Sequence, residues 1–111
     1  MELSQHILEF KNISELREWL IANHLTEKHA WIKLSTKADP TGVDYAEAVK
    51  QAICFGWIDG TAKNVSGKFY RKFSPRRKNS SWTDLNLERA RELIENDLMF
   101  EEGFKKLPEN F

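Results

Sequence analysis

The sequence predicts an α+β domain in which helices pack on one face of a small, mostly antiparallel sheet. Three observations support this prediction. Apolar residues recur at helical spacing over residues 45–54, they alternate with a period of two over residues 30–36, and two extended runs flank turn residues at 65–67. A chain of 111 residues is long enough for one hydrophobic core but not for two, so residues 1–111 are expected to form a single domain.

The first forty residues predict an arm, a helix, a strand and a loop. Residues 1–12 show no clear period and are expected to lead in as an extended arm. Ser14 is the predicted N-cap of a helix over residues 15–24, because acidic residues follow it in the first turn. Residues 30–36 then alternate as a strand with one buried face, and residues 37–42 form a loop rich in turn residues.

The middle of the chain predicts a second helix with clear start and stop signals. Asp44, with Glu47 three residues later, resembles a capping box in front of the helix over residues 45–54. Gly56 is expected to end this helix in a left-handed conformation, which a residue with a Cβ atom adopts only at a cost. The helix is therefore expected to stop immediately before the next extended run.

A hairpin and two helices complete the predicted order of elements. The chain reads as extended over residues 57–64 and 68–73, and Pro75 is expected to terminate the second strand because it lacks an amide donor. Thr83 is the preferred N-cap of the next helix, with Ser81 as the alternative, and a short helix is expected within residues 101–107.

Composition narrows the class of protein and its compartment. A hydrophobic content of 41% favours a globular chain over a disordered one. No apolar run approaches the roughly 20 residues of a membrane span, and the first residues do not resemble a signal peptide. One cysteine and three scattered histidines offer neither an internal disulfide nor a metal-ligand spacing. We therefore expect a cytoplasmic protein without membrane insertion, metal or cofactor.

A strongly basic stretch lies within this neutral chain. The 22 residues from Ala62 to Thr83 contain no acid and seven cations, namely Lys63, Lys68, Arg71, Lys72, Arg76, Arg77 and Lys78. The rest of the chain therefore carries ten cations against seventeen acids. This segregation of charge predicts a binding site for an anion on or beside the hairpin.

The hairpin strand itself offers one candidate surface. On a strand, Lys68, Tyr70 and Lys72 point to one face, which places an aromatic ring between two cations. Such a face suits phosphate groups or single-stranded nucleic acid, because cations follow the backbone and a ring stacks on a base. The alternative is a solvated strand whose lysines discourage pairing with another sheet edge.

The loop after the hairpin offers a second candidate. Pro75 restricts the backbone beside Arg76 and Arg77, and guanidinium groups bind phosphate or carboxylate as a bidentate fork. Trp57 and Trp82 flank the cationic stretch, so they either line a pocket or belong to the core. The structural alternative is that one arginine pairs internally with an acid; the candidates are Asp59, Asp84, Glu88 and Glu92. For at least one of the two arginines we expect this internal pairing.

Asp59 and Cys54 are the candidates for enzymatic chemistry. An enzyme would use Asp59 as a general acid or base, but no second catalytic group accompanies it, so a turn residue or an arginine partner is favoured. Cys54 ends an apolar helix face and is expected to be a buried small hydrophobe rather than a nucleophile.

An ordered string of motif residues runs from about residue 8 to about residue 104. It comprises Trp19, Asn23-His24, Trp31, residues 52–60, residues 73–77, Ser81-Trp82, Asn86, Leu98-Met99 and Gly103. This string resembles the bacterial YdeI/OmpD-associated family, often labelled bacteriocin-protection proteins. The resemblance implies a small cytosolic α+β domain, no established catalytic chemistry and a link to envelope or antimicrobial stress. It covers the N-terminal domain of that family, without the helical C-terminal extension of many members.

The sequence therefore predicts a non-enzymatic binding module for an anionic small molecule or an acidic protein surface. The candidate ligand-binding residues are Arg76, Arg77, Lys78, Trp57, Trp82, Asp59, Tyr70 and Lys72. Two alternatives stay open. The first is single-stranded nucleic-acid binding by the basic hairpin, against which the neutral overall charge argues. The second is an enzyme that acts on a small molecule through Asp59.

Overall fold

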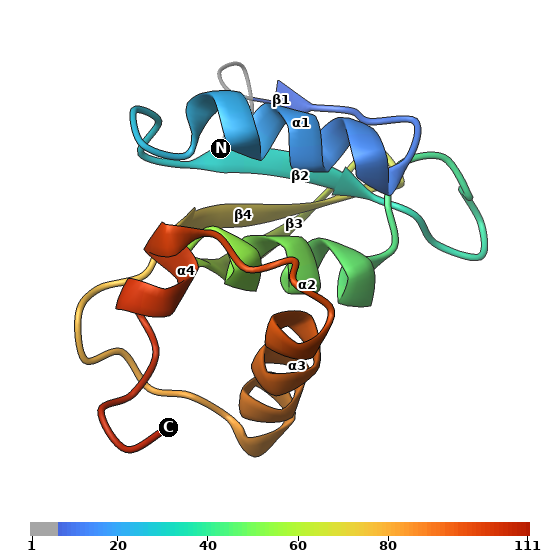
Figure 1. The fold of residues 1–111 in the computed structure, drawn as a ribbon. Coiled ribbons are helices and arrows are strands. Elements are labelled where there is room, and N and C mark those ends of the chain that lie inside the picture. The colour runs from blue at the N-terminus through green and yellow to red at the C-terminus, as the bar shows by residue number, and fades with distance from the viewer. Residues whose placement is uncertain (1–6) are drawn as a thin grey trace.

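The computed structural model describes residues 7–111, which form four strands and four helices (Figure 1). In chain order the elements are β1 (Ile7–Leu8), α1 (Ile13–Asn23), β2 (Ala30–Leu34), α2 (Tyr45–Cys54), β3 (Trp57–Val65), β4 (Lys68–Pro75), α3 (Asp84–Glu95) and α4 (Glu101–Lys105). The predicted α+β class is confirmed. The part of the predicted arm formed by residues 1–6 lies outside the described residues.

The four strands form one mixed sheet in the order β1-β2-β4-β3. β1 runs parallel to β2, whereas β2 and β3 both pair antiparallel with β4. The predicted hairpin is confirmed as β3–β4, with Val65 opposite Lys68 and a register shift between Asp59 and Ala62. Because β4 ends at Pro75 and continues directly into the basic loop, the sheet determines where that loop leaves the domain.

Side-chain caps fix the starts of three helices. The predicted caps of α2 and α3 are confirmed: Asp44 accepts from the Glu47 amide at 3.1 Å and Thr83 from the Asn86 amide at 3.1 Å. The prediction for α1 is wrong, because Asn12 is the cap and accepts from the Glu15 amide at 3.0 Å. An Asn two residues before Ser14 satisfies the same first-turn amides, so α1 begins earlier than predicted.

One face of the sheet and the helices share a single core. Ala30, Ile32 and Leu34 of β2 pack with buried residues of α1, α2 and α3. Cys54 is fully buried there, and burial raises the pKa of its thiol, as expected for a structural cysteine. None of the helices formed by residues 7–111 has the length and apolar character needed to cross a bilayer.

Gly56 makes the tight turn from α2 into β3. Its φ of +75° is the predicted left-handed conformation, and a Cβ atom there would lie 2.6 Å from the carbonyl oxygen of Glu102 in α4. Its own carbonyl oxygen accepts a hydrogen bond of 2.8 Å from the Arg76 amide. This one residue therefore joins the end of α2, α4 and the loop that follows β4.

An ion pair between a buried lysine and a partly exposed aspartate closes the loop between β2 and α2. The Lys33 side chain is 1% exposed, and its Nζ donates to the carbonyl oxygen of Thr41 at 2.7 Å and to its Oγ1 at 2.8 Å. Asp39 lies 3.0 Å from the same ammonium group. These contacts satisfy the buried charge and hold the loop against the strand.

Candidate functional site

The loop that leaves β4 lies beside the segment that follows α4. Figure 1 shows both at the end of the molecule where α4 and the C-terminal residue lie. We call residues 75–82 together with residues 105–111 the β4–α3 corner. Two contacts join its halves: the indole Nε1 of Trp82 donates to the Lys106 carbonyl oxygen at 3.2 Å, and the Lys106 ammonium donates to the Arg76 carbonyl oxygen.

The backbone of the β4–α3 corner is held in a tight turn. Pro75 is the last residue of β4, in agreement with the predicted end of that strand. The next amide, that of Arg76, is bonded to Gly56, and the Ser80 amide donates to the Arg77 carbonyl oxygen at 3.2 Å. Asn79 adopts a positive φ of 66°, which turns the chain back toward Arg76.

Arg76 fills the inside of this turn. Its side chain is 3% exposed, and Nη1 donates to Ser80 Oγ at 2.9 Å and to the Ser81 carbonyl oxygen at 3.0 Å. The guanidinium carbon lies 3.7 Å from the centroid of the Trp82 ring, a close cation–π contact. Its buried Nε has no hydrogen-bond partner among the described residues.

The charge of Arg76 is not neutralised by an adjacent acid. Within residues 7–111 no carboxylate lies within 4.0 Å of it. Desolvation lowers the pKa of its guanidinium to about 10, an effect that the more distant Asp59 partly opposes. The group is therefore still cationic at neutral pH, and it carries a positive charge into a largely dehydrated position.

The prediction that at least one of Arg76 and Arg77 pairs internally with an acid is wrong, because within residues 7–111 neither has a carboxylate within 4.0 Å. Asp59 is taken by Arg71 instead, whose Nη1 lies 3.6 Å from the carboxylate. The reason is the strand register: Asp59 lies opposite Phe73, and Arg71 is two residues away on the same face of β4. Arg77 is exposed, and no ion pair joins it to any other residue in the described range.

Two neighbouring clefts open at the β4–α3 corner. The lysine cleft, of about 140 Å³, is lined by Ser80, Trp82, Lys78, Lys105, Lys106 and Glu109, among others. The ring cleft, of about 370 Å³, is lined by Ser80, Trp82, Leu87, Arg91, Pro108 and Phe111, among others. Ser80, Trp82 and Pro108 line both clefts, so the two are contiguous around the Trp82 ring.

The structure brings together only part of the predicted site. Lys78 and Trp82 line the lysine cleft, whereas neither Arg76 nor Arg77 lines a cleft. The Arg76 guanidinium lies over the Trp82 ring. Trp57 is a core residue, 1% exposed, whose indole Nε1 donates to the His24 carbonyl oxygen at 3.3 Å. A surface ligand therefore cannot reach Trp57, and only one of the two flanking tryptophans lines a cleft.

Tyr70 and Lys72 lie away from the β4–α3 corner. They belong to the opposite face of β4 from Phe73, where Lys72 pairs in register with Trp31. Tyr70 is only 7% exposed and packs with Trp31. A stacking platform needs an accessible ring, so this burial argues against base stacking on the hairpin.

Asp59 belongs to a closed polar cluster at the surface. Its Oδ2 accepts a 2.6 Å hydrogen bond from the Tyr45 hydroxyl as well as the contact with Arg71. Arg71 also donates to the Gly60 carbonyl oxygen at 2.9 Å and lies over the Tyr45 ring. Desolvation, with the bond to Asp59, raises the pKa of Tyr45, so the phenol stays protonated as a donor. Asp59 is therefore the partner of an arginine, Arg71, as the structural alternative for this residue predicted.

Residues 105–111 contribute half of the corner, and sequence reasoning did not assign them to the site. Lys105-Lys106 followed by Pro108 repeats the combination of paired cations and a nearby proline seen at residues 75–77. That repetition was the available signal. It does not show which segment folds against which, because the contact between Trp82 and Lys106 spans 24 positions.

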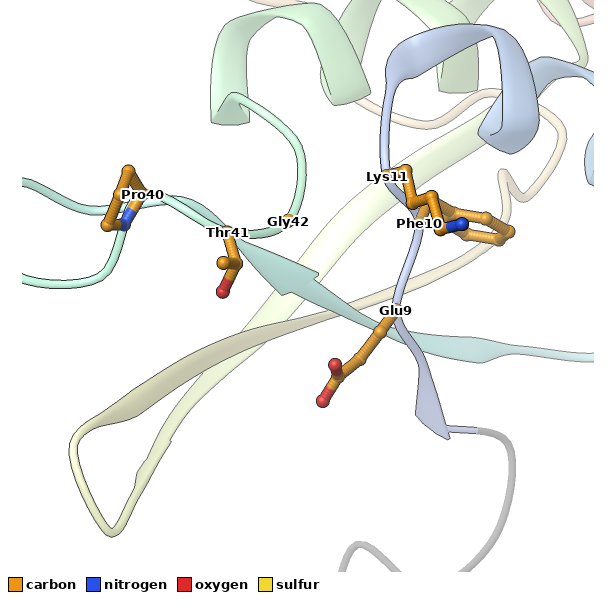
Figure 2. Close-up of a pocket in the computed structure, with 6 residues that line it drawn as sticks. All are labelled: Glu9, Phe10, Lys11, Pro40, Thr41 and Gly42. Atoms are coloured by element: carbon orange, nitrogen blue, oxygen red, sulfur yellow. The ribbon is translucent and has the colours of Figure 1, made fainter.

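A larger hollow lies elsewhere, at the other end of the sheet. Figure 2 shows it between Glu9, Phe10 and Lys11 on one side and Pro40, Thr41 and Gly42 on the other, with a volume of about 490 Å³. Two of its polar residues are already engaged: Thr41 contacts Lys33, and Glu9 lies 4.0 Å from Lys68. Within the part of the chain that is described, no three His, Cys, Asp or Glu side chains cluster as metal ligands.

Comparison with known proteins places the chain in a family. A family model described as a domain of unknown function (DUF8412) matches residues 8–106. The chain belongs to this family. The matched range covers all four strands except the first residue of β1, all four helices and both segments of the β4–α3 corner up to Lys106. No curated protein and no solved structure matches the chain.

Proposed function

We propose that the protein is a non-catalytic binding module that holds an anion at the β4–α3 corner. The observation that carries the proposal is the buried Arg76 guanidinium, which is charged at neutral pH and has no carboxylate within 4.0 Å in residues 7–111. Interactions between charges strengthen as water is excluded, so an anion entering beside this group gains more than it would at an exposed lysine.

The neighbouring side chains support the same proposal. Lys78, Lys105 and Lys106 line the lysine cleft, and Glu109 is the single acid that residues 7–111 contribute to its lining. Arg76 is covered by Trp82 and bonded to Ser80, so it acts as a fixed charge behind the cleft rather than as an exposed fork. Direct contacts to the anion then come from the lysines and from the Ser80 hydroxyl, while the helices covering one face of the sheet hold the corner in place.

A titration with inorganic phosphate tests the proposal. Amide chemical shifts followed by NMR should change at residues 78–82 and 105–109, and Lys78→Glu should weaken binding about tenfold by placing a like charge in the cleft. Lys63→Glu is the matched control, because it changes the net charge equally on β3 and lines neither cleft. Saturable shifts that are absent from the corner, or equal losses in both variants, would refute the proposal.

The relation to the YdeI/OmpD-associated family and a cytoplasmic location are part of the proposal. What supports the relation is that two blocks of the motif, residues 52–60 and 73–77, pack together. The Gly56 carbonyl oxygen accepts from the Arg76 amide at 2.8 Å, and Asp59 lies opposite Phe73. A purification of the tagged chain from cells exposed to envelope stress, compared with unstressed cells, tests whether that context applies.

A further inference from the structure

We infer that the ligand of the β4–α3 corner is a phosphate monoester carried on a planar ring, with the phosphate in the lysine cleft and the ring in the ring cleft. This inference rests on the proposed function and names the class of its ligand. Two observations support it: the two clefts differ in size and in lining residues, and Ser80, Trp82 and Pro108 line both.

The two clefts differ in volume, so they suit chemical groups of different size. The lysine cleft, about 140 Å³, is well below the range of roughly 300–1,000 Å³ typical of small-molecule sites, so it suits one small group. The ring cleft, about 370 Å³, lies within that range. Because Ser80, Trp82 and Pro108 belong to both linings, one molecule can occupy the two without crossing bulk solvent.

The linings also differ in chemistry. The lysine cleft carries three ammonium groups, of which Lys105 is paired with Glu102 at 3.0 Å and Lys106 donates to the Arg76 carbonyl oxygen. Lys78 is exposed and has no ion pair within residues 7–111. An incoming anion therefore finds one uncommitted lysine, two partly engaged ones and the buried charge of Arg76 behind them.

The ring cleft combines flat apolar walls with the polar side chains of Ser80, Asn110 and Arg91. Trp82, Leu87, Pro108 and Phe111 line it, and the guanidinium carbon of Arg91 lies 5.0 Å from the centroid of the Phe111 ring. The flat faces of Trp82, Pro108 and Phe111 favour an aromatic or similarly planar group, which stacks and removes apolar surface from water. Inorganic phosphate alone would leave the flat faces of Trp82 and Phe111 uncovered.

A phosphate monoester fits the charges better than a carboxylate. It carries between about −1.5 and −2 charges at pH 7 and presents three acceptor oxygens. A carboxylate brings a single charge to a cleft that already contains Glu109, so its net attraction is smaller. The second phosphate charge interacts with the remaining lysines and with the Arg76 charge.

The test compares three probes by isothermal titration calorimetry and NMR: inorganic phosphate, phenyl phosphate and phenol. Phenyl phosphate should bind about tenfold more tightly than inorganic phosphate, because burial of a phenyl ring adds apolar contact. It should shift resonances of Leu87 and Phe111 that inorganic phosphate leaves unchanged. Phenol should bind more weakly than either, because it lacks the charge.

Variants locate the ring. Phe111→Ala should remove most of the advantage of phenyl phosphate and leave inorganic phosphate binding unchanged. Phe104→Ala is the matched control: this phenylalanine is 49% exposed on α4 and lines neither cleft, so both affinities should stay at the wild-type value. Trp82 is not used as the test position, because its replacement would also disturb Arg76.

The outcomes separate this inference from the proposed function. If inorganic phosphate binds at the corner and phenyl phosphate binds no more tightly, the inference is overturned and the anion site stands. If phenyl phosphate gains affinity that Phe111→Ala does not reduce, the ring lies elsewhere and the inference is again wrong. If neither phosphate compound binds, both proposals fail.

Discussion

The guanidinium carbon of Arg76 lies 3.7 Å from the centroid of the Trp82 ring, inside a turn where the arginine side chain is 3% exposed. Burying a cation is costly unless hydrogen bonds or an opposite charge offset the lost hydration. Here Ser80 and Ser81 provide two acceptors and the indole ring provides a third favourable contact. None of these contacts supplies a full negative charge, and an external anion would supply it.

Replacement of Arg76 by methionine should destabilise the fold by about 1–2 kcal/mol. The variant keeps an unbranched side chain but loses two hydrogen bonds from a charged donor and the cation–π contact. The loss is moderate because the cost of burying a charge disappears with it. Urea denaturation measures the change, and Arg77→Met, at an exposed position, should stay within about 0.5 kcal/mol of the wild type. Equal losses in the two variants would contradict the role assigned to Arg76.

Gly56→Ala should be far more destabilising than Gly67→Ala. Both glycines have positive φ, +75° and +83°, so both substitutions carry the left-handed penalty of about 1–2 kcal/mol. At Gly56 the new Cβ atom would also lie 2.6 Å from the Glu102 carbonyl oxygen and force α4 to move, whereas at Gly67 nothing lies within 4 Å. Thermal unfolding of both variants isolates the packing contribution, which should add at least about 1 kcal/mol. A Gly56 variant no weaker than the Gly67 variant would show that α4 does not pack there as described.

Acid should weaken the ion pair between Lys33 and Asp39 as the pH falls from about 4 to about 2. Hydrogen bonds from Thr41 and Lys33 lower the pKa of Asp39 from 3.8 to about 2. A carboxyl group whose folded-state pKa is depressed contributes its full stability above the unfolded value and loses it as pH falls through the folded value. Asp39→Asn should therefore be less stable than the wild type above about pH 4, and the difference should shrink as pH approaches 2. Chemical denaturation at a series of pH values gives both curves.

A second variant distinguishes the ion pair from loop geometry. In Asp39→Asn the Lys33 ammonium stays buried with only Thr41 as a partner. Lys33→Met/Asp39→Asn removes that buried charge, so the double variant should be more stable than Asp39→Asn alone. A double variant that is less stable by the sum of the single losses would mean that the two side chains do not interact.

The parts of the fold that the sequence predicted are those governed by local chemistry. Asp44 and Thr83 are helix caps because a short acceptor side chain reaches an amide three residues later. Both partners lie within four consecutive residues, so the sequence alone shows the pairing. Gly56 was recognisable because only glycine tolerates its conformation at low cost. The prediction of Ser14 as the N-cap failed because Asn12, two residues earlier, offers the same acceptor chemistry. The local sequence does not show which of the two side chains caps the helix.

The candidate site was only half predictable because its geometry is tertiary. Trp57 and Trp82 both flank the basic stretch, yet Trp57 is in the core and Trp82 lines both clefts. What separates them is packing: Trp19 of α1 meets the Trp57 ring edge-on at 5.9 Å, and the Lys106 carbonyl oxygen holds Trp82 at the surface. The hydrophobic periodicity of a sequence does not predict contacts between segments that are so far apart in the chain. The burial of Arg76 was not predicted because it too depends on contacts between distant segments. In addition, an arginine is rarely fully buried without a charged partner.

Glu109→Gln should strengthen binding of inorganic phosphate about two- to fivefold, because Glu109 is the one carboxylate lining the lysine cleft and its charge opposes an incoming anion through partly hydrated space. The effect should fall as salt is raised from low ionic strength to about 0.5 M, where the Debye length is only a few ångströms. Glu95→Gln is the control, since it removes the same charge at an exposed position of α3 outside both clefts and should leave the affinity unchanged. Calorimetric titrations at two salt concentrations measure both variants. If Glu95→Gln tightens binding as much as Glu109→Gln does, phosphate responds to net charge alone, and the lysine cleft is not its site.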